Sequence, residues 1–394
     1  MKEDQSRRPD SFLEKWFRIS RLSYPVPPHA RTLSYTLGGI TFVGFILLFA
    51  SGFLMGQFYQ PTPDRAYETV KHLIEEIPGG RFLRAFHYWM AQAVILSLIL
   101  HLLRVFIGGA YKSPRLFTWY FGVGLLGTAL FGSYFSGTVL KWDQESFEAL
   151  QHYREGLRFF GPIGSFLGST EAIPLNVKIY LSHISVFPLL LLFLIACHFY
   201  LVNTFSLSPL PFGEDSARSY LPAEEMTGRF LEHVRSILLY GLVYYGLVAV
   251  IALIFSAPLG PPVSQEEIGV KPPWPFLWFY GLENITGRID SIVYASGALF
   301  LALFLLPILD RGEERNPIRR KKTMVAGATT LLLIAGLSIY GAISEPQVHH
   351  HGNDNTTPHH GSAPQPDQQM DDNNNGHAEE HEDHEGGDHG EGSE

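Results

Sequence analysis

Apolar residues along the chain fall into long blocks, separated by polar segments rich in proline, glycine and charge. A helix needs about 20 consecutive apolar residues to cross the hydrocarbon core of a bilayer. Seven blocks reach or approach that length, and neither 181–202 nor 324–343 contains a charged residue. The pattern therefore predicts an all-α membrane protein with seven transmembrane helices. They are expected at 33–57, 86–107, 117–139, 181–202, 236–256, 291–309 and 324–343.

The positions of lysine and arginine predict how these helices are oriented. Cytoplasmic loops carry an excess of basic residues, and an odd number of spans puts the two termini on opposite sides. The N-terminal segment and the second, fourth and sixth loops hold 19 of the 29 basic residues, and the other side holds 10. We therefore expect a cytoplasmic N-terminus, without a cleavable signal peptide, and a C-terminal tail on the periplasmic or extracellular side.

Polar segments divide the spans into regions. Residues 203–232 are polar and contain prolines, which suggests a link between a four-span and a three-span unit. The outward loops 140–180 and 257–290 are rich in proline, glycine and aromatic residues, which indicates structure at the membrane surface. The expected regions are a cytoplasmic N-terminal segment (1–32), a four-helix domain (33–205), a cytoplasmic linker (206–235), a three-helix domain (236–345) and a tail (346–394).

The formal charge of −9 comes from the end of the chain. Residues 346–394 contain 12 acidic and no basic residues, while residues 1–345 contain 29 basic and 26 acidic residues, a net of +3. This balance gives no reason to expect a nucleic-acid partner. The tail also holds nine of the 17 histidines, so we expect a disordered extension or, alternatively, a low-affinity trap for copper, zinc or nickel. The single cysteine, Cys197, excludes an internal disulfide and a cysteine-based metal site within this chain.

Four histidines lie inside the predicted spans, where an ionisable side chain is costly and usually functional. His87 and His101 are fourteen residues apart on the second span, and His183 and His198 are fifteen apart on the fourth. At about 100° and 1.5 Å per residue, each pair lies on roughly one helix face with about 21–22 Å between its members. The two spans run in the same direction. His87 can therefore face His183 near the outer surface, and His101 can face His198 near the inner one.

Two stacked histidine pairs without acidic ligands fit two bis-imidazole haems, which would relay electrons across the membrane. Zinc would require a third or fourth ligand, and the distance between the pairs is too great for one metal. A transporter with a histidine proton relay is disfavoured, because the spans contain no carboxylates. Histidines that only pack between helices are a further alternative, and four at these spacings by chance would be unusual.

The two spans that carry these histidines, and several other segments of the chain, resemble cytochrome b. The resemblance rests on HYWMAQAVILSLILH and SHISVFPLLLLFLIACH, on YTLGGITFVGFILLFASGFLMGQFYQPTP in the first span and on GTVLKWDQ after the third. The fourteen residues between the fourth span's histidines are typical of the cytochrome b6 branch. KPPWPFLW stands where the family has its PEWY motif, and LDRGEERNPIRR resembles the loop before the last helix of subunit IV. The resemblance covers about residues 12–345. It implies a b6-like four-helix dihaem bundle fused to three subunit IV-like helices, with no eighth helix.

The resemblance implies two non-covalent b-type haems and assigns residues to them. The outer iron would be bound by His87 and His183, and the inner iron by His101 and His198. Helix glycines let the family's porphyrins approach the backbone, and arginines bind the propionates. The matching residues here are Gly38, Gly52, Gly122, Arg84, Arg104 and Arg115.

Two positions depart from the family pattern around the haems. Fourteen residues after Gly122 stands Ser136, and Gly137 comes one place late, which can alter the haem pocket. Thr36 stands where b6-type chains carry the cysteine that holds an extra haem. We therefore expect no covalent c-type haem.

The reaction that the resemblance implies is quinol oxidation at the outer face of a bacterial cytoplasmic (inner) membrane. One electron goes to a Rieske iron–sulfur partner and onward to a c-type cytochrome subunit. The other crosses through the haems to reduce quinone at the inner face, and the protons build a gradient. The chain would be one subunit of a quinol:cytochrome c (or similar acceptor) oxidoreductase. It would form a homodimer of a multi-subunit complex in contact with the quinone pool and membrane lipid.

The outer quinol pocket is expected between the loop after the third span and the Pro-Pro-Trp-Pro segment, with Pro272, Trp274 and Glu283 as candidate catalytic residues. The family's usual proton-accepting Glu is Pro273 here, and proline accepts no proton. Either Glu283, Asp143 or Glu145 serves instead, or quinol oxidation is altered or lost. In the second case the chain is a dihaem electron conduit or membrane anchor that links the quinone pool to another redox partner without a bifurcating outer site.

Overall fold

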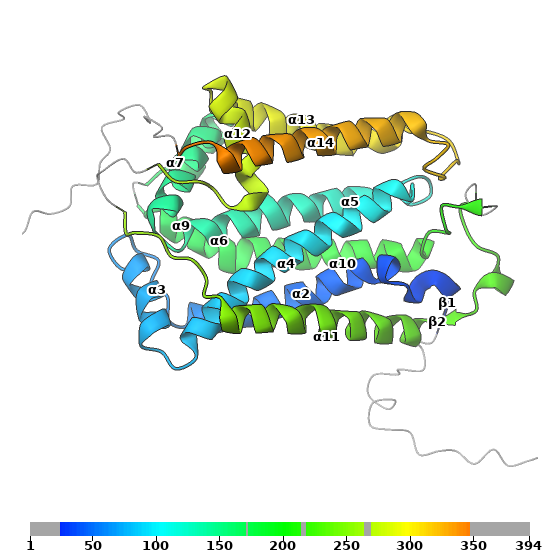
Figure 1. Ribbon diagram of the computed structural model, residues 1–394, viewed down its shortest axis with the longest axis horizontal. Coiled ribbons are helices and arrows are strands. Elements are labelled where there is room, and N and C mark those ends of the chain that lie inside the picture. The colour runs from blue at the N-terminus through cyan, green and yellow to red at the C-terminus, as the bar shows by residue number, and fades with distance from the viewer. Residues whose placement is uncertain (1–23, 171, 214–217, 264–268, 347–394) are drawn as a thin grey trace, which may run out of the picture. The chain divides into compact units, whose positions relative to one another are not determined.

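The computed structural model describes residues 24–170, 172–213, 218–263 and 269–346. Within these residues seven helices are long and apolar enough to cross a membrane, which confirms the predicted fold class (Figure 1). The expected N-terminal segment up to residue 23 and the expected tail from residue 347 lie outside the described residues. The spans are Leu33–Gly56, Gly80–Ile107, Leu116–Val139, Leu175–Phe205, Phe230–Ile254, Asp290–Leu309 and Lys321–Ile343.

Several helices begin before the apolar block that predicted them. The second span starts at Gly80 rather than 86, and the fourth at Leu175 rather than 181. The fifth starts at Phe230, inside the expected linker. Hydropathy marks only the part of a helix inside the hydrocarbon, whereas its backbone hydrogen bonds continue into the polar interface.

Two of the spans are interrupted by π-helical turns. The third consists of α5 (Leu116–Gly127), the π segment η3 (Thr128–Tyr134) and α6 (Phe135–Val139). The fourth consists of α9 (Leu175–Leu181), the π segment η4 (Ser182–Val186) and α10 (Phe187–Phe205). The other spans are α2 (Leu33–Gly56), α4 (Gly80–Ile107), α11 (Phe230–Ile254), α13 (Asp290–Leu309) and α14 (Lys321–Ile343).

The first four spans pack around an apolar core, and α11 joins them. The core includes Ile40, Met90, Val94, Leu126 and Leu191. The Tyr245 hydroxyl on α11 donates to the Ile40 carbonyl on α2 (2.8 Å), and the Tyr244 hydroxyl donates to the Ala93 carbonyl on α4 (2.9 Å). The fifth span therefore packs with helices that come before the expected linker.

Shorter elements lie at the end of the helices where the two predicted outward loops are found. They are α3 (Ala66–Glu75), α7 (Gln144–Arg158), α8 (Gly161–Gly168), η7 (Trp274–Phe276) and α12 (Leu277–Thr286) (Figure 1). The buried carboxylate of Asp143 caps α7 by accepting from the Ser146 N–H (3.0 Å), and it also accepts from the Gly260 N–H (2.8 Å). These contacts show that both loops carry structure in their described parts.

The opposite end contains a short β ladder that the sequence pattern did not predict. Strands β1 (Pro25–Val26) and β2 (Gly228–Arg229) pair antiparallel, with Val26 opposite Gly228. The 3₁₀ turns η2 (Pro28–Arg31) and η6 (Ala223–Glu225) flank them. Two residues are too few for a period-two pattern to reveal a strand.

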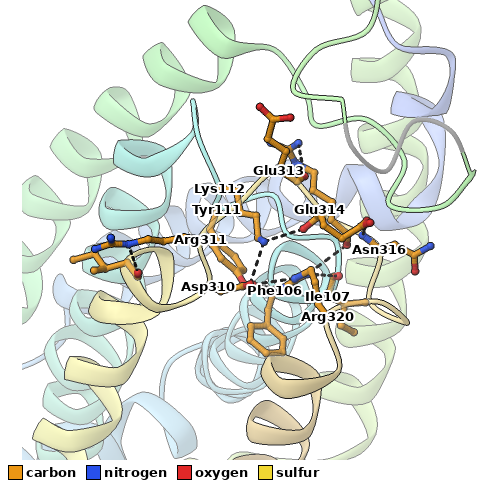
Figure 2. A network of polar contacts seen from close by, with 12 residues as sticks. Phe106, Ile107, Tyr111, Lys112, Asp310, Arg311, Glu313, Glu314, Asn316 and Arg320 are labelled. Carbon is orange, nitrogen blue, oxygen red and sulfur yellow. Dashed lines mark hydrogen bonds and ion pairs between the residues drawn. The ribbon is translucent and has the colours of Figure 1, made fainter.

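An ionic network at the same end joins the loop after the second span to the loop before the last span (Figure 2). The Asp310 carboxylate accepts hydrogen bonds from the Tyr111 hydroxyl, from Lys112 Nζ (3.1 Å) and from Arg320 Nε (2.9 Å). Burial alone would raise the pKa of Asp310. The hydrogen bonds from Tyr111 and Lys112 and the charges of Arg320 and Lys112 overcome that effect and hold this pKa below its usual range. The segment LDRGEERNPIRR is thus fixed to the four-helix region by a charged contact.

Candidate functional site

The histidine pair expected near the outer surface, called the outer pair below, consists of His87 on α4 and His183 in η4, which lie within range of electrostatic interaction. His87 Nδ1 lies 2.9 Å from Ser51 Oγ on α2, and His183 Nδ1 lies 2.8 Å from Ser136 Oγ on α6. Each serine hydroxyl donates its single hydrogen to a carbonyl of its own helix, to Leu47 (2.8 Å) and Gly132 (2.5 Å) respectively. With that hydrogen used, each oxygen can accept from Nδ1–H, and Nε2 of each imidazole then carries the free lone pair. The backbone of Leu48 and of Ser133 also hydrogen-bonds His87 and His183, respectively.

The inner pair consists of His101 on α4 and His198 on α10, which also lie within electrostatic range of each other. His198 Nδ1 lies 3.0 Å from the Thr118 carbonyl, which can only accept, so this nitrogen carries the hydrogen. His101 Nδ1 is buried without a hydrogen-bond partner among the described residues. The two levels therefore differ in the hydrogen bonds that hold their imidazoles.

A glycine on a neighbouring helix faces each histidine. A Cβ atom built at Gly38 would lie 2.9 Å from His101 Cε1, and one built at Gly52 would lie 3.1 Å from His87 Cε1. The corresponding distances are 3.7 Å from Gly122 to His198 and 3.0 Å from Gly137 to His183. The absence of side chains at these positions keeps the imidazole surroundings open on the side of α2 and of the third span.

The one-place offset of Gly137 is compensated by the backbone of the third span. A π turn closes i→i+5 hydrogen bonds and accommodates one residue more than an α-helical turn. The segment η3 lies between Gly122 and Gly137, and it brings Gly137 to His183 although fifteen residues separate the two glycines. In the same way η4 contains His183 and takes up the extra residue between the histidines of the fourth span.

The three predicted arginines are engaged with backbone or polar partners. Arg84 donates to the carbonyls of residues 257 and 258, both at 2.7 Å. Arg104 lies 3.6 Å over the Tyr35 ring and donates to Ser208 Oγ (3.1 Å). Arg115 donates to four carbonyls between residues 205 and 219. Burial, with the nearby charges of other arginines, lowers the pKa of Arg115 to about 10.

A cavity lies beside the inner histidine pair. Both histidines, Gly122 and the side chains of Arg104 and Arg115 line it, and the rest of its wall is largely apolar. The free Nε2 lone pair of His198, a glycine opposite each ring and a basic edge suit a flat, apolar group that carries acidic substituents. Among the described residues no cluster of three or more His, Cys, Asp or Glu could hold a metal ion.

The structure separates the candidate residues of the outer quinol pocket into two places. Trp274 Nε1 donates to Gln92 Oε1 on α4 (2.7 Å), and the Tyr134 hydroxyl donates to the same oxygen (2.8 Å). Pro272 and Pro273 precede Trp274 in an extended segment before η7. Sequence reasoning missed Gln92, although a polar residue five places after His87 in an apolar span was a visible signal.

Glu283 lies elsewhere, on α12 beside α7. Its side chain is nearly buried, and its Oε2 lies 3.2 Å from Nε2 of His152, which is about a quarter exposed. His152 Nδ1 lies 2.8 Å from the Glu148 carbonyl. Nothing in the sequence pointed to His152, because 131 positions separate it from Glu283.

The other two candidate carboxylates share a lysine. Lys141 Nζ lies 2.5 Å from Glu145 and 3.1 Å from Asp143. Burial raises the pKa of Glu145, and the charge and hydrogen bond of Lys141 only partly oppose this effect. Asp143 has a structural task as the cap of α7, so Glu145 is the more available of the two.

The fold and the histidine pairs define an all-α, multi-pass membrane protein with two stacked bis-imidazole levels. Residues 21–206 match the family described as cytochrome b/b6/petB, and residues 264–351 match the one described as cytochrome b (C-terminal)/b6/petD. Cytochromes b6 of Prochlorococcus marinus (strain NATL1A) and Mastigocladus laminosus are each 35% identical over 185 residues, which cover 45% of this chain and 84% and 85% of theirs.

A solved structure titled "Hyperthermophilic respiratory Complex III" shares the fold, with a TM-score of 0.70 and 21% identity, over 84% of this chain and 91% of that chain. The chain belongs to the cytochrome b/b6 family, with a b6-like N-terminal half and a subunit IV-like C-terminal part. The predicted resemblance is thereby confirmed. Membership in this family implies the binding of b-type haem, and the histidine levels described above fit it.

Proposed function

We propose that the chain is the dihaem cytochrome b subunit of a quinol-oxidising Rieske/cytochrome b complex in a bacterial cytoplasmic membrane. The observation that carries the proposal is the pair of histidine levels, at which no described residue hydrogen-bonds Nε2 of any of the four imidazoles. A haem bound at each level would supply a one-electron carrier near each membrane surface. Its iron ligands would be His87 with His183 at the outer level and His101 with His198 at the inner level.

The glycines and arginines would support these two groups. Gly38 and Gly122 leave room at the inner level, and Gly52 does so at the outer level. Arg104 and Arg115 line the inner cavity, where their guanidinium groups would bind acidic substituents of a haem. Arg84, at the outer end of α4, would bind the acidic substituents of a haem at the outer level.

The outer quinol pocket would use the two places that the fold separates. Trp274, held by Gln92, would form one wall together with the Pro272 segment. Glu283 would accept a quinol proton and pass it to His152, whose partial exposure gives the proton a way to the outside. A carboxylate beside a histidine is a suitable acid–base pair for this transfer.

Pro273 supports a second candidate function, because this residue has no acid–base group and stands at the position of the family's usual glutamate. Without proton acceptance at the outer pocket, the chain would be a dihaem conduit or anchor between the quinone pool and another redox partner. The arrangement of the haem levels would be the same for both functions, so only the outer chemistry distinguishes them.

The remaining features of the proposal concern assembly. The partners would be a Rieske iron–sulfur protein and a c-type cytochrome, in a homodimeric multi-subunit complex embedded in lipid. The exposed apolar surfaces of α13 and α14 are available to lipid or to such subunits. The N-terminus would be cytoplasmic, and the regions 33–205 and 236–345 would serve as the dihaem and subunit IV-like domains.

Haem content tests the central part of the proposal. A pyridine haemochrome assay on the purified protein should give two b-type haems per chain, and the variants His87→Leu and His101→Leu should each give one. The exposed His72 is the matched control, and His72→Leu should keep both haems. Fewer than two haems in the unmodified chain would overturn the dihaem assignment.

Quinol oxidation in native membranes tests the choice between the two functions. Inhibitor-sensitive oxidation, together with a co-purifying iron–sulfur subunit, would support the bifurcating complex. Two haems without such oxidation and without that partner would favour the conduit.

A further inference from the structure

Two serine hydroxyls distinguish the outer histidine level from the inner one. Ser51 on α2 and Ser136 on α6 come from different helices, yet each lies within 2.9 Å of Nδ1 of an outer histidine. Both residues are buried, with 4% and 3% of their surfaces exposed. The same side-chain group therefore contacts both His87 and His183, from two different helices.

Each hydroxyl is fixed as an acceptor toward its histidine. Ser51 donates to the Leu47 carbonyl and Ser136 to the Gly132 carbonyl, four residues back on their own helices. Because its only hydrogen is used there, each oxygen offers a lone pair to Nδ1–H. The donated bond also polarises the oxygen, which strengthens the bond that it accepts.

The inner level has one such acceptor instead of two. The Thr118 carbonyl accepts from His198, whereas His101 Nδ1 has no partner among the described residues. A hydrogen bond from the second ring nitrogen fixes the tautomer and orientation of a metal-bound histidine and makes it a more basic ligand. A more basic ligand favours the more positively charged, oxidised iron.

We propose that Ser51 and Ser136 are positioning residues that lower the reduction potential of the outer haem relative to the inner one. This inference rests on the proposed dihaem function. A second feature raises the potential of the inner haem relative to the outer one. Arg104 and Arg115 line the inner cavity, and their positive charges favour the reduced form of a group bound there. Serine substitutions leave those arginines unchanged, so they isolate the hydrogen-bond effect.

The experiment is a potentiometric titration of both haems in membranes that contain the complete complex. Ser51→Ala and Ser136→Ala should each make the ratio of reduced to oxidised outer haem roughly tenfold larger at a fixed potential. For a one-electron carrier this equals a rise of about 59 mV in the reduction potential. The inner haem should not move. Ser51→Thr and Ser136→Thr, which keep a hydroxyl, should restore the original ratio.

Ser133→Ala is the matched control, because Ser133 lies in the same span and its buried hydroxyl has no hydrogen-bond partner among the described residues. An outer potential that stays unchanged in both alanine variants with both haems bound would overturn the inference. Loss of the outer haem in both alanine variants would also overturn it, because the hydroxyls would then be needed to bind the haem rather than to set its potential. The haem count of the unmodified chain decides the proposed function separately.

Discussion

Deletion of Val186 from the π turn of the fourth span should leave both haem sites intact, whereas deletion of Leu96 from the second span should destroy one. The two residues form a matched pair. Both are apolar, both are exposed on their helices (53% and 46%), and each lies between the two histidines of its span. They differ in that Val186 belongs to η4, while Leu96 lies in the uninterrupted helix α4.

The expected magnitudes follow from helix geometry. Fourteen residues of α-helix end about 40° short of four full turns, and α4 places His87 and His101 with this spacing. Deletion of Val186 gives His183 and His198 the same spacing once η4 relaxes to an α-helix, so they keep a common face. Deletion of Leu96 turns one α4 histidine by about 100°, which moves its Cα by about 3.5 Å around the helix and 1.5 Å along it. Metal–ligand distances tolerate only about ±0.2 Å.

Haem per chain in the purified variants is the measurement, with a redox titration to identify which haem remains. We expect about two haems after deletion of Val186 and about one after deletion of Leu96, since each haem needs both of its ligands. Deletion of Leu130 from η3 should also leave two, because Gly122 and Gly137 would then stand fourteen residues apart. A haem lost on deletion of Val186, or two haems kept on deletion of Leu96, would refute the reasoning.

The polar contacts away from the histidine levels can be tested by single substitutions. Asp310→Asn should lower stability in thermal unfolding by about 3 kcal/mol, while Glu225→Gln, at an exposed ion pair, should cost under about 0.5 kcal/mol. The pKa of Asp310 is lowered in the folded protein, so its contribution to stability is fully present above the unfolded pKa of about 3.9 and is lost as the pH falls through the folded-state pKa. Asp310→Asn should therefore remove this part of the loss of stability in acid. Glu283→Gln should slow quinol oxidation about 100-fold with both haems bound, and unchanged turnover would reject Glu283 as the proton acceptor. Gln92→Leu should raise KM for quinol roughly tenfold by releasing Trp274, measured by steady-state kinetics with haem spectra as the control; an unchanged KM would contradict its proposed role.

The fold class and the histidine levels could be predicted because both depend on short-range periodicity. Hydropathy located seven spans, and the helical repeat converted the spacing of His87 and His101 into a common face. Contacts between distant segments carry no such signal. The Glu283–His152 pair and the placement of α11 against α2 and α4 depend on how helices pack, so they became visible only in the structure.

The late glycine shows why spacing alone misjudged one position. The fourteen-residue rule assumes a uniform α-helix, and under that rule Ser136 takes the place of the glycine expected to face a haem. The π turn η3 breaks the assumption, so Gly137 faces His183 and Ser136 remains close enough to bind its Nδ1. One added residue thus supplies both an open backbone and a hydrogen-bond acceptor at the same imidazole.

The two π turns also depend on each other. Gly132 in η3 packs against the ring of Phe187, the first residue after η4, and a Cβ atom at this glycine would lie 2.7 Å from that ring. A side chain at position 132 would therefore push the third span away from the fourth at the level of His183. The Gly132 carbonyl is in addition the nearer of two carbonyls, the other being that of Ser133, that accept from the Ser136 hydroxyl. The irregular backbone is thus concentrated at the outer level, where one glycine connects the packing of the two spans to the hydrogen bond that orients His183.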